Sequence, residues 1–430
     1  MRAAVAAALA ACFLLVAAGC GSSTAARGQT GGDAAQLVPP TALAFATADA
    51  NLDSAQWATV KDLFGPIELP KGVDYRSDVK PAIGDQLNVA VLGIQNGKPE
   101  AVAIVKPDDA AKLSKLAAKL DQGAEHYTVQ QIAGWSVVAD SPEAFQAVRT
   151  ASSGTSLADN ANYRSAKSQL GGSALATAYA TGKGAQALPE KMRAFFRVGG
   201  SPQWVAARVT AEDNAVRLDA RGSGATGPAA YEPTLLGDVP SGAILAVSFK
   251  DVDELLARLR AEPTLRRSLP PFATKLNGLS GEGVLYVLPA SIIPVVTLEV
   301  RPQDPASATR ALQAIASQVG SNLPLHVKRE GRKVLLTNAA AGPGSGSSGA
   351  LVDDRQFKDA LAAADVPKDV TWLAYADMPR LRPLLQAFSA LMSTKDRKTT
   401  FESNDKVGIF VAYGARVGPA SRLVVRVTHA

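Results

Sequence analysis

Short apolar stretches, separated by turn residues, predict β-strands along most of the chain. Leu87–Ile94 and Glu100–Lys106 flank Asn96-Gly97, a dipeptide that favours the tight turn of a hairpin. Arg217–Ala220 alternates polar and apolar residues, which predicts a sheet with one face in solvent. Further strands are predicted at Ala42–Thr47, Tyr127–Ala139 (a hairpin that turns at Gly134), Ala174–Ala180 and Trp204–Ala220. Because tight turns join successive strands, we expect a mainly antiparallel sheet.

Between these strands, apolar residues three and four positions apart predict amphipathic helices. From Asp108 to Leu120 an apolar stripe runs opposite three lysines, and a second helix starts at Asp304 as N-cap with Pro305 in its first turn. The residues expected to be buried are Leu113, Leu116, Ala117 and Leu120 in the first helix, and Ala308, Leu312, Ile315 and Val319 in the second. Shorter helices are predicted at Pro142–Val148, Asn160–Leu170 and Leu188–Phe196. We expect the helices to pack on one face of the sheet, which makes the fold class α+β.

The two halves of the chain resemble each other in the same order, at an offset of about 200 residues. The matched pairs are Val38–Phe45 with Val239–Ala246, Gly84-Asp85 with Gly281-Glu282, Lys106-Pro107 with Arg301-Pro302, and Leu157–Asp159 with Leu351–Asp353. This pattern predicts two homologous α+β repeats, at 37–222 and 229–430, joined by the flexible segment Gly222–Pro228. One large domain with chance repeats is the alternative.

The N-terminus has the pattern of a secretory signal. Met1-Arg2 carries a positive charge, Ala3–Ala18 is apolar, and small residues lead to Gly19-Cys20. The apolar run is shorter than the roughly 20 residues that cross a bilayer comfortably. We therefore expect a signal peptide at 1–19 and a flexible, Gly-rich tether at 20–36. A plain signal peptide with an incidental cysteine, or an uncleaved anchor, remains the alternative.

Val16-Ala17-Ala18-Gly19-Cys20 resembles the lipobox of bacterial prolipoproteins, in which position 17 more often carries Leu. The resemblance implies cleavage between Gly19 and Cys20 and attachment of a diacylglyceryl group and palmitate to Cys20. Two or more acyl chains give stable membrane anchoring. The implied location is the extracytoplasmic face of the cell membrane.

A second resemblance concerns the body of the protein. Val38–Thr47, Gln56-Trp57 and Ile83–Asp85 resemble a family of exported proteins of high-GC Gram-positive bacteria that is catalogued as a domain of unknown function. It implies export and a shared architecture over most of the chain after the tether, and no activity, cofactor or catalytic residue.

Composition supports a folded, exported body. The 430 residues are 47% hydrophobic and 20% charged, as in ordinary globular proteins. Two cysteines exclude a disulfide framework and a cysteine-built metal site. The net charge of +6 comes mainly from basic residues of the second half. They include Arg258, Arg260, Arg266, Arg267 and Lys275, and then Lys395, Arg397 and Lys398. We interpret them first as solvated helix faces, and second as a surface for anionic lipids or an acidic envelope polymer; nucleic acid is not expected.

Candidate catalytic groups are few. His126, His326 and His429 are the three histidines, and each is expected to be an exposed side chain at a strand edge. No Gly-x-Ser-x-Gly motif accompanies them. The acidic pairs Asp108-Asp109, Glu212-Asp213 and Asp353-Asp354 fall at helix starts or turns, where carboxylates cap and stabilise helices. The Gly-rich segment Gly342–Gly349 lacks the Lys-Ser/Thr of a phosphate-binding loop. No metal or other cofactor is expected.

These observations predict a lipid-anchored, non-catalytic binding or scaffolding protein of the cell envelope, with a polymer, a lipid or a protein as its partner. A carrier of a lipid or other apolar ligand is the first alternative, and an envelope hydrolase is the second. A large apolar cavity would favour the carrier, and a sealed core with a flat surface would favour the binding or scaffolding protein. A cleft with converging Ser, His and carboxylate groups would favour the hydrolase.

Overall fold

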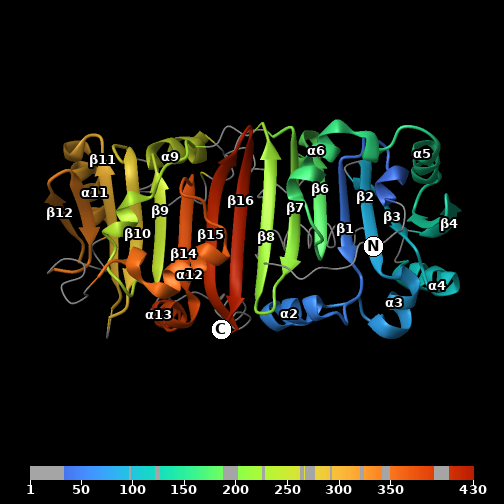
Figure 1. The fold of residues 1–430 in the computed structure, drawn as a ribbon, viewed down its shortest axis with the longest axis horizontal. Coiled ribbons are helices and arrows are strands. Elements are labelled where there is room, and N and C mark those ends of the chain that lie inside the picture. The colour runs from blue at the N-terminus through green and yellow to red at the C-terminus, as the bar shows by residue number, and fades with distance from the viewer. Residues whose placement is uncertain are drawn as a thin grey trace. The chain divides into compact units, whose positions relative to one another are not determined.

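A computed structural model describes residues 33–95, 98–121, 126–186, 202–224, 228–261, 266, 277–290, 293–319, 324–340, 349–391 and 406–430. They form two compact units (Figure 1). Unit 1 contains the described residues up to 186 and 202–224, and unit 2 contains those from 228 onward. The predicted helix Leu188–Phe196, most of the Gly342–Gly349 segment and residues 1–32 lie outside the described residues.

The described strands of unit 1 form one sheet in which every neighbouring pair is antiparallel, as predicted. Their order is β8 (Ala215–Ser223), β7 (Trp204–Ala211), β6 (Ala176–Thr181), β1 (Ala44–Asp49), β2 (Gln86–Gln95), β3 (Lys98–Val105), β5 (Trp135–Ala139) and β4 (Thr128–Ile132). The predicted hairpins are therefore present, and Gly134 turns one of them at φ 78°.

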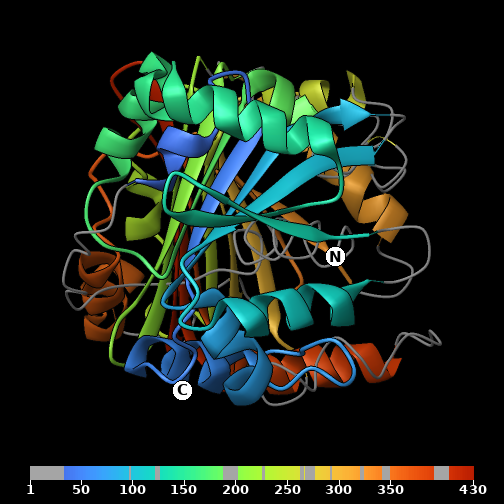
Figure 2. The same cartoon turned by 90° about the vertical axis from the view of Figure 1, so that its right-hand side faces the viewer.

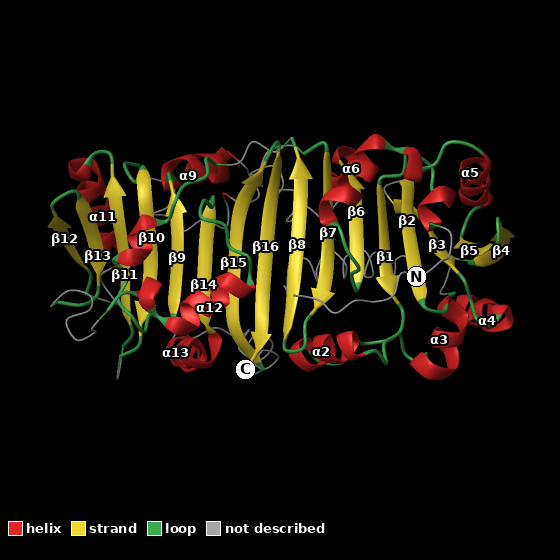
Figure 3. Cartoon of the chain, viewed as in Figure 1, coloured by secondary structure: helices red, strands yellow, loops and turns green. Residues whose placement is uncertain are grey.

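Unit 2 has the same strand order, with each strand numbered eight higher (Figure 3). The order is β16 (Ala420–His429), β15 (Val407–Val417), β14 (Trp372–Asp377), β9 (Leu245–Lys250), β10 (Gly281–Leu288), β11 (Val295–Pro302), β13 (Lys333–Thr337) and β12 (His326–Glu330). All neighbouring pairs within this sheet are antiparallel. Residues that share a strand and a pairing register in the two units are called topologically equivalent below.

Helices lie between the strands. Unit 1 contains η1 (Ala34–Leu37), α2 (Ala55–Phe64), η2 (Tyr75–Val79), α3 (Lys80–Ile83), α4 (Ala110–Leu120), α5 (Pro142–Ser153), η3 (Leu157–Asp159), α6 (Ala161–Leu170) and α7 (Gly182–Gln186). Unit 2 contains η4 (Thr234–Gly237), α9 (Val252–Ala261), α11 (Pro305–Val319), η6 (Leu351–Asp353), α12 (Arg355–Ala363) and α13 (Met378–Leu391). The helices predicted at Asp108–Leu120, from Asp304, at Pro142–Val148 and at Asn160–Leu170 are present as α4, α11, α5 and α6.

The start of α11 follows the sequence prediction closely. The Asp304 carboxylate accepts the amide of Ala306 at 2.9 Å, and Pro305 occupies the first position of the helix. The side chains of Ala308, Leu312 and Ile315 are buried, whereas that of Val319 lies outside the described side chains. In α4, Leu113, Leu116 and Ala117 are buried and Leu120 is partly buried.

The prediction that helices pack on one face of the sheet is wrong. In β3, Val102 and Ile104 belong to a core cluster with α5 and α6, whereas Ala103 and Val105 belong to a cluster with α3 and α4. Successive residues of a strand point to opposite faces, so both faces are apolar here and both need cover. Figure 2 shows helices on both sides of these strands. In unit 2, Tyr375 and Ala376 of β14 likewise belong to different clusters.

The predicted solvent face of β8 is also absent, because Arg217 and Asp219 are 8% and 1% exposed. Helices α2 and α6 both contact β8. The burial of Asp219 is accompanied by an ion pair of 3.5 Å with Arg221. In this strand, the alternation of polar and apolar residues therefore reflects one polar face and one apolar face, both of which are covered.

Candidate functional site

A cavity of about 860 Å³ lies in unit 1, between the sheet and helix α6. Strands β1, β2 and β6 supply one wall, and α6 and the following residues 171–174 supply another. Asp33 and Ala34, at the start of η1, complete the described lining. Asn160 caps α6 by accepting the amides of Asn162 and Tyr163 at 2.9 and 3.2 Å, so the orientation of this helix is fixed locally.

The sheet side of the cavity consists of two neighbouring rows of side chains that cross the strands. One row is apolar and aromatic: Ala90 of β2, Phe45 of β1, Tyr179 of β6 and Ala206 of β7 pair in register. The next row is polar and consists of Asn88, Thr47, Thr177 and Arg208. Since the rows are two residues apart on each strand, they lie on the same face of the sheet.

Aromatic rings connect this face to α6. The ring of Tyr163 on α6 lies 6.0 Å from the ring of Phe45 and 5.2 Å from that of Tyr179, in edge-to-face geometry both times. Burial raises the pKa of Tyr179 to about 12 and raises the pKa of Tyr163 as well. Both phenols therefore stay protonated at neutral pH and are available as hydrogen-bond donors.

Several polar groups of the lining are buried without a protein partner. The Asn88 amide nitrogen donates to the Ile104 carbonyl at 3.0 Å, but its oxygen has no hydrogen bond within the described part of the chain. The Tyr179 hydroxyl and the Asn51 side-chain oxygen likewise are buried and have no hydrogen bond within the described part of the chain. Thr47 and Thr177 share one hydrogen bond of 2.7 Å, which uses one of their two hydroxyl protons. The Asn88, Tyr179 and Asn51 oxygens are enclosed and therefore lie behind the accessible surface of the lining, whereas the threonine hydroxyls belong to half-buried residues.

Carboxylates dominate the charge of the lining. Asp33, Asp49 and Asp85 face one ammonium group, that of Lys167, which pairs with Asp33 at 2.5 Å. The pKa of Asp49 is raised, first because the group is buried and also because Asp85 is near, although the Asn51 amide partly opposes the shift. The lining residues carry an excess of negative charge, and the guanidinium of Arg208 at the end of the polar row lies beside them and donates to the Gly171 carbonyl at 2.7 Å.

The equivalent region of unit 2 is filled with side chains. The row equivalent to Asn88–Thr47–Thr177–Arg208 consists of Val284, Ser248, Leu373 and Tyr413. All four are buried. Tyr231 lies in the same core cluster, and its hydroxyl forms a 2.8 Å hydrogen bond with Ser248. Its backbone pairs with Val370, the equivalent of the cavity residue Ala174.

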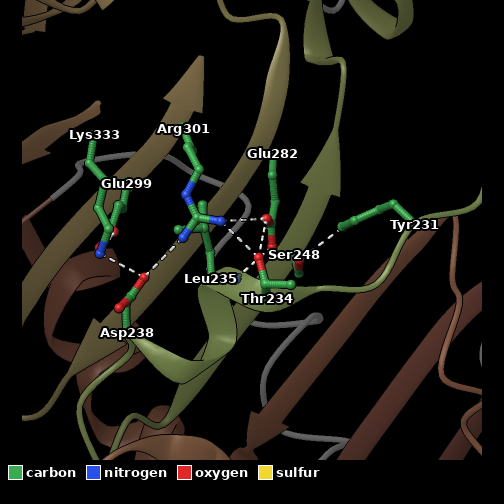
Figure 4. A network of polar contacts seen from close by, with 9 residues as sticks. All are labelled: Tyr231, Thr234, Leu235, Asp238, Ser248, Glu282, Glu299, Arg301 and Lys333. Carbon is green, nitrogen blue, oxygen red and sulfur yellow. Dashed lines mark hydrogen bonds and ion pairs between the residues drawn. The ribbon is translucent and has the colours of Figure 1, made fainter. Parts of the chain in front are cut away.

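Unit 2 contains instead a network of ion pairs between the η4 region and strands β10, β11 and β13 (Figure 4). Lys333 contacts Asp238 at 2.6 Å and Glu299 at 3.0 Å, and Arg301 contacts Asp238 and Glu282, both at 3.4 Å. Glu282 also accepts the Thr234 hydroxyl at 2.7 Å and the Leu235 amide at 2.6 Å. The network therefore fastens η4 to strands β10, β11 and β13.

Glu299 is the buried member of this network and is 3% exposed. Burial raises its pKa, and the contacts with Lys333 oppose the shift. Burial alone lowers the pKa of Lys333, but its contacts with Asp238 and Glu299 outweigh this effect and hold the pKa above its usual value. The two groups thus favour each other's charged form, as expected of a structural ion pair.

The histidines have separate, solvent-accessible settings. His126 lies 3.7 Å from Asp121 with a side chain 81% exposed, and His326 is exposed at the start of β12. The Nδ1 atom of His429 lies 2.9 Å from the Ala430 carbonyl. Within the described ranges, no group of three or more His, Cys, Asp or Glu residues is arranged to hold a metal ion.

The acidic pairs act as caps where the sequence predicted helix starts. Asp109 accepts the amide of Ala111 at 2.8 Å at the start of α4, and Asp354 accepts the amide of Phe357 at 3.0 Å at the start of α12. Glu212-Asp213 lies in the turn between β7 and β8.

Other predicted site residues are partly outside the description. Arg258 pairs with Glu254 on α9, and Arg260 donates to Asn277 at 3.3 Å, whereas Arg267, Lys275 and the 395–398 cluster fall outside the described residues. Gly19 and Cys20 do so as well, so the lipid-attachment site stays a prediction.

Sequence analysis missed the cavity residues Thr47, Asn88, Tyr163, Thr177 and Tyr179. A signal was present: Thr177 and Tyr179 alternate with alanines in a strand, and Thr47 and Asn88 also fall in apolar strands. The pattern alone does not reveal which strands are neighbours, and neighbours decide that these side chains meet.

Comparisons with known proteins do not place the chain in a family. No family model and no curated protein matches the chain. One solved structure, "Structure of crystal form I of TP0453", is 12% identical, with 78% of this chain and 98% of that chain covered; its TM-score of 0.16 carries no argument. Among the described residues, no helix is both long and apolar enough to span a membrane.

Proposed function

We propose that the protein binds a small organic ligand in the cavity of unit 1. The observation that carries this proposal is the difference between the two sheets. Unit 1 has a cavity beside the row that contains Thr47 and Thr177, whereas the equivalent row of unit 2 is packed with Val284, Leu373 and Tyr413. The cavity volume falls in the range of about 300–1,000 Å³ that is typical of small-molecule sites.

The chemistry of the lining favours binding over hydrolysis. No histidine or cysteine is among the described lining residues, so Ser173, Thr47 and Thr177 have no imidazole base there. A hydroxyl nucleophile needs a general base within hydrogen-bond distance, and the hydroxyls of Thr47 and Thr177 bond to each other at 2.7 Å instead. The carrier hypothesis therefore has better support than the envelope-hydrolase alternative, and the ligand is expected to be partly polar rather than a plain hydrocarbon.

We further propose that the units are homologous repeats and that unit 1 has kept, or acquired, the binding function. The shared strand order supports this, as does a pair of identical contacts: the amide of Leu157 donates to Val38, and that of Leu351 to Val239, each at 2.7 Å. The edge-to-face pair Tyr163–Tyr179 has its equivalent in Phe357–Tyr375, at 5.2 and 5.0 Å. The lipobox-like sequence at Cys20 supports a lipid anchor on the extracytoplasmic side, so the ligand would be a compound of the envelope or the medium.

The test is a comparison of co-purified compounds. Thr177→Leu places in unit 1 the side chain that Leu373 provides in unit 2, and it is expected to fill part of the cavity. Thr150→Leu makes the same change on the exposed side of α5, away from the lining. The full chain is purified from its own cells, extracted with organic solvent and analysed by mass spectrometry.

We expect a small organic compound at up to one molecule per chain in the wild type and in Thr150→Leu, and at least about tenfold less in Thr177→Leu. A compound that is retained equally by both variants, or no compound at all, would contradict the proposal. Thermal melting of each unliganded variant checks that the fold is kept.

A further inference from the structure

We infer that a strip of apolar side chains on the sheet of unit 2 binds the acyl chain of one lipid molecule. The strip lies on the sheet face that also packs against α13, opposite the face that contains Ser248 and Tyr413. It is separate from the cavity of unit 1, so the inference does not rest on the function proposed above.

Two neighbouring rows of residues form this apolar strip, and each row crosses strands β10, β9, β14, β15 and β16 in register (Figure 3). The first row is Gly283, Phe249, Trp372, Gly414 and Leu423. The second row is Leu285, Val247, Ala374, Ala412 and Val425. The indole N–H of Trp372 is the one polar group on these ten side chains. The strip therefore suits a hydrocarbon rather than a polar ligand.

The larger side chains of the strip remain partly exposed in the full chain. They are Phe249, Trp372, Leu423, Leu285, Val247, Ala374 and Val425. The next row along the strands is covered, because Val287 and Ala376 pack with Leu381 of α13. Beside β10, Leu298 and Val300 of β11 pack with α11. None of the partly exposed side chains belongs to these two clusters.

Unit 1 has small, buried residues at the equivalent place. Val247 and Trp372 correspond to Ala46 and Ala176, which are 4% and 6% exposed. The strand order shared by the two units therefore does not require partly exposed apolar side chains on this face. Their contact with water is unfavourable, and a bound hydrocarbon would remove it.

Two glycines allow the aromatic rings to lie along the strip. A Cβ at Gly283 would lie 2.3 Å from the ring of Phe249, and a Cβ at Gly414 would lie 2.6 Å from the indole Nε1 of Trp372. Each ring therefore lies over the backbone of the neighbouring strand. A helix packs by fitting its ridges into grooves, whereas a flexible chain can follow a surface without them.

The size of the strip favours a lipid chain over a protein. Four spacings between five strands give a length of about 19 Å, and two rows two residues apart give a width of about 7 Å. A stable protein interface buries roughly 800 Å² on each partner, which is several times the area of the strip. A second copy of the chain finds too little area here, whereas an extended acyl chain can follow the long direction.

The experiment measures binding of n-alkanols of increasing length to the purified full chain in detergent-free buffer. Trp372 is the reporter, because the other three tryptophans, Trp57, Trp135 and Trp204, are at most 8% exposed. Bound alkanol is expected to protect Trp372 from acrylamide, a quencher dissolved in the water. Affinity should rise about twofold per methylene, since a chain on an open strip buries about half of its surface. The rise should end once the alkanol is longer than the strip.

A matched pair of variants on the β15–β16 hairpin locates the site. Val425 belongs to the strip, whereas Val417 lies at the end of β15 and is 42% exposed. Val425→Asp is expected to weaken dodecanol binding at least tenfold, and Val417→Asp to leave it unchanged. Ala374→Asn is a second strip variant with the same expected direction. Melting of each variant without alkanol separates loss of binding from loss of fold, and either strip variant alone suffices.

Several results would overturn the inference. Equal binding of dodecanol by the Val425 and Val417 variants would show that the strip is not the site. Failure of acrylamide to reach Trp372 in the free chain would show that another segment covers the strip. A dimer that Val425→Asp dissociates would make a second copy the occupant. Binding to phosphatidylcholine vesicles that depends on Val425, without binding of alkanols, would indicate membrane docking.

Failure of this inference is distinct from failure of the proposed function. Thr177→Leu, which alters the cavity of unit 1, is expected to leave dodecanol binding unchanged. If Thr177→Leu abolishes that binding and Val425→Asp does not, the alkanol occupies the cavity, so the strip is refuted and the proposed function stands.

Discussion

At the scale of single residues, the two units solve the same packing problem with different chemistry. Leu37, Ile104 and Trp135 are buried apolar residues in unit 1. Their topological equivalents in unit 2 are Asp238, Glu299 and Lys333, three of the charged residues in Figure 4. An ion pair in the interior compensates desolvation only while both partners are present. Glu299 is the buried member of the three, so a charge at this position requires its cation Lys333 where unit 1 has Trp135.

Loss of one partner should therefore be costly. Lys333→Met leaves Glu299 buried without its cation, and we expect the free energy of unfolding to fall by about 2–4 kcal/mol at pH 7. The triple variant Asp238→Leu, Glu299→Ile, Lys333→Trp copies unit 1 and is expected to recover most of this loss. Denaturant unfolding measures both; a single variant as stable as the wild type would refute the structural role.

The pH dependence of the Lys333→Met variant follows from the sign of the Glu299 shift. The pKa of Glu299 is raised by burial above its ordinary value of 4.5, and removal of Lys333 raises it further. The folded state then binds more protons than the unfolded state, so stability falls as pH rises from about 4.5 through the raised pKa. The deficit against the wild type is expected to be small below that window and full above it. Unfolding curves at several pH values test this, and a constant deficit would argue against it.

At the scale of elements, each unit requires a glycine near the start of one strand, β2 in unit 1 and β10 in unit 2. Gly84 has φ 73° and ψ −149°, and a Cβ there would lie 2.2 Å from the Lys106 carbonyl oxygen. Gly281 has φ 104°, and its Cβ would lie 2.4 Å from the Arg301 carbonyl oxygen. The close approach of two backbone segments explains a glycine here in each half, although strand pairing makes Gly281 the equivalent of Asp85, so the predicted match of Gly84-Asp85 with Gly281-Glu282 is off by one residue.

Gly84→Ala and Gly281→Ala should each destabilise the protein more than Gly65→Ala. Gly65 also has a positive φ of 87°, but its Cβ would meet nothing within 4 Å. Backbone strain of about 1–3 kcal/mol is common to all three, and the clash adds about 1–3 kcal/mol at Gly84 and Gly281. Thermal melting ranks the variants; equal losses at the three positions would show that crowding is unimportant.

At the scale of the whole molecule, location depends on Cys20, which lies outside the described residues. If Cys20 is lipidated, Cys20→Ala is expected to release the protein from the membrane fraction or to leave its signal uncleaved, and to abolish incorporation of labelled palmitate. Cys12→Ala, in the predicted signal, is the matched control and should leave labelling unchanged. Fractionation and mass spectrometry of the N-terminus give the readout. Unaltered labelling of the Cys20 variant would refute the anchor.

Many of the strands and helices could be predicted from local signals in the sequence. The spacing of apolar residues placed α4 and α11, the turn residues placed the hairpins, and Asp304 and the acidic pairs marked helix starts, because these signals act within a few residues of the chain. A local signal was also available where the prediction was wrong, since Val102–Val105 is apolar without alternation and so indicates a strand covered on both faces.

Only the tertiary structure decided where the cavity lies. Asn88, Thr47 and Thr177 are far apart in the chain and become neighbours because β1 pairs with both β2 and β6 in one register. The difference between a cavity in unit 1 and a packed core in unit 2 then depends on a few side chains, such as Leu373 and Tyr413 in place of Thr177 and Arg208. Strand pairing and the filling of space are long-range properties, and the order of residues along the chain does not display them.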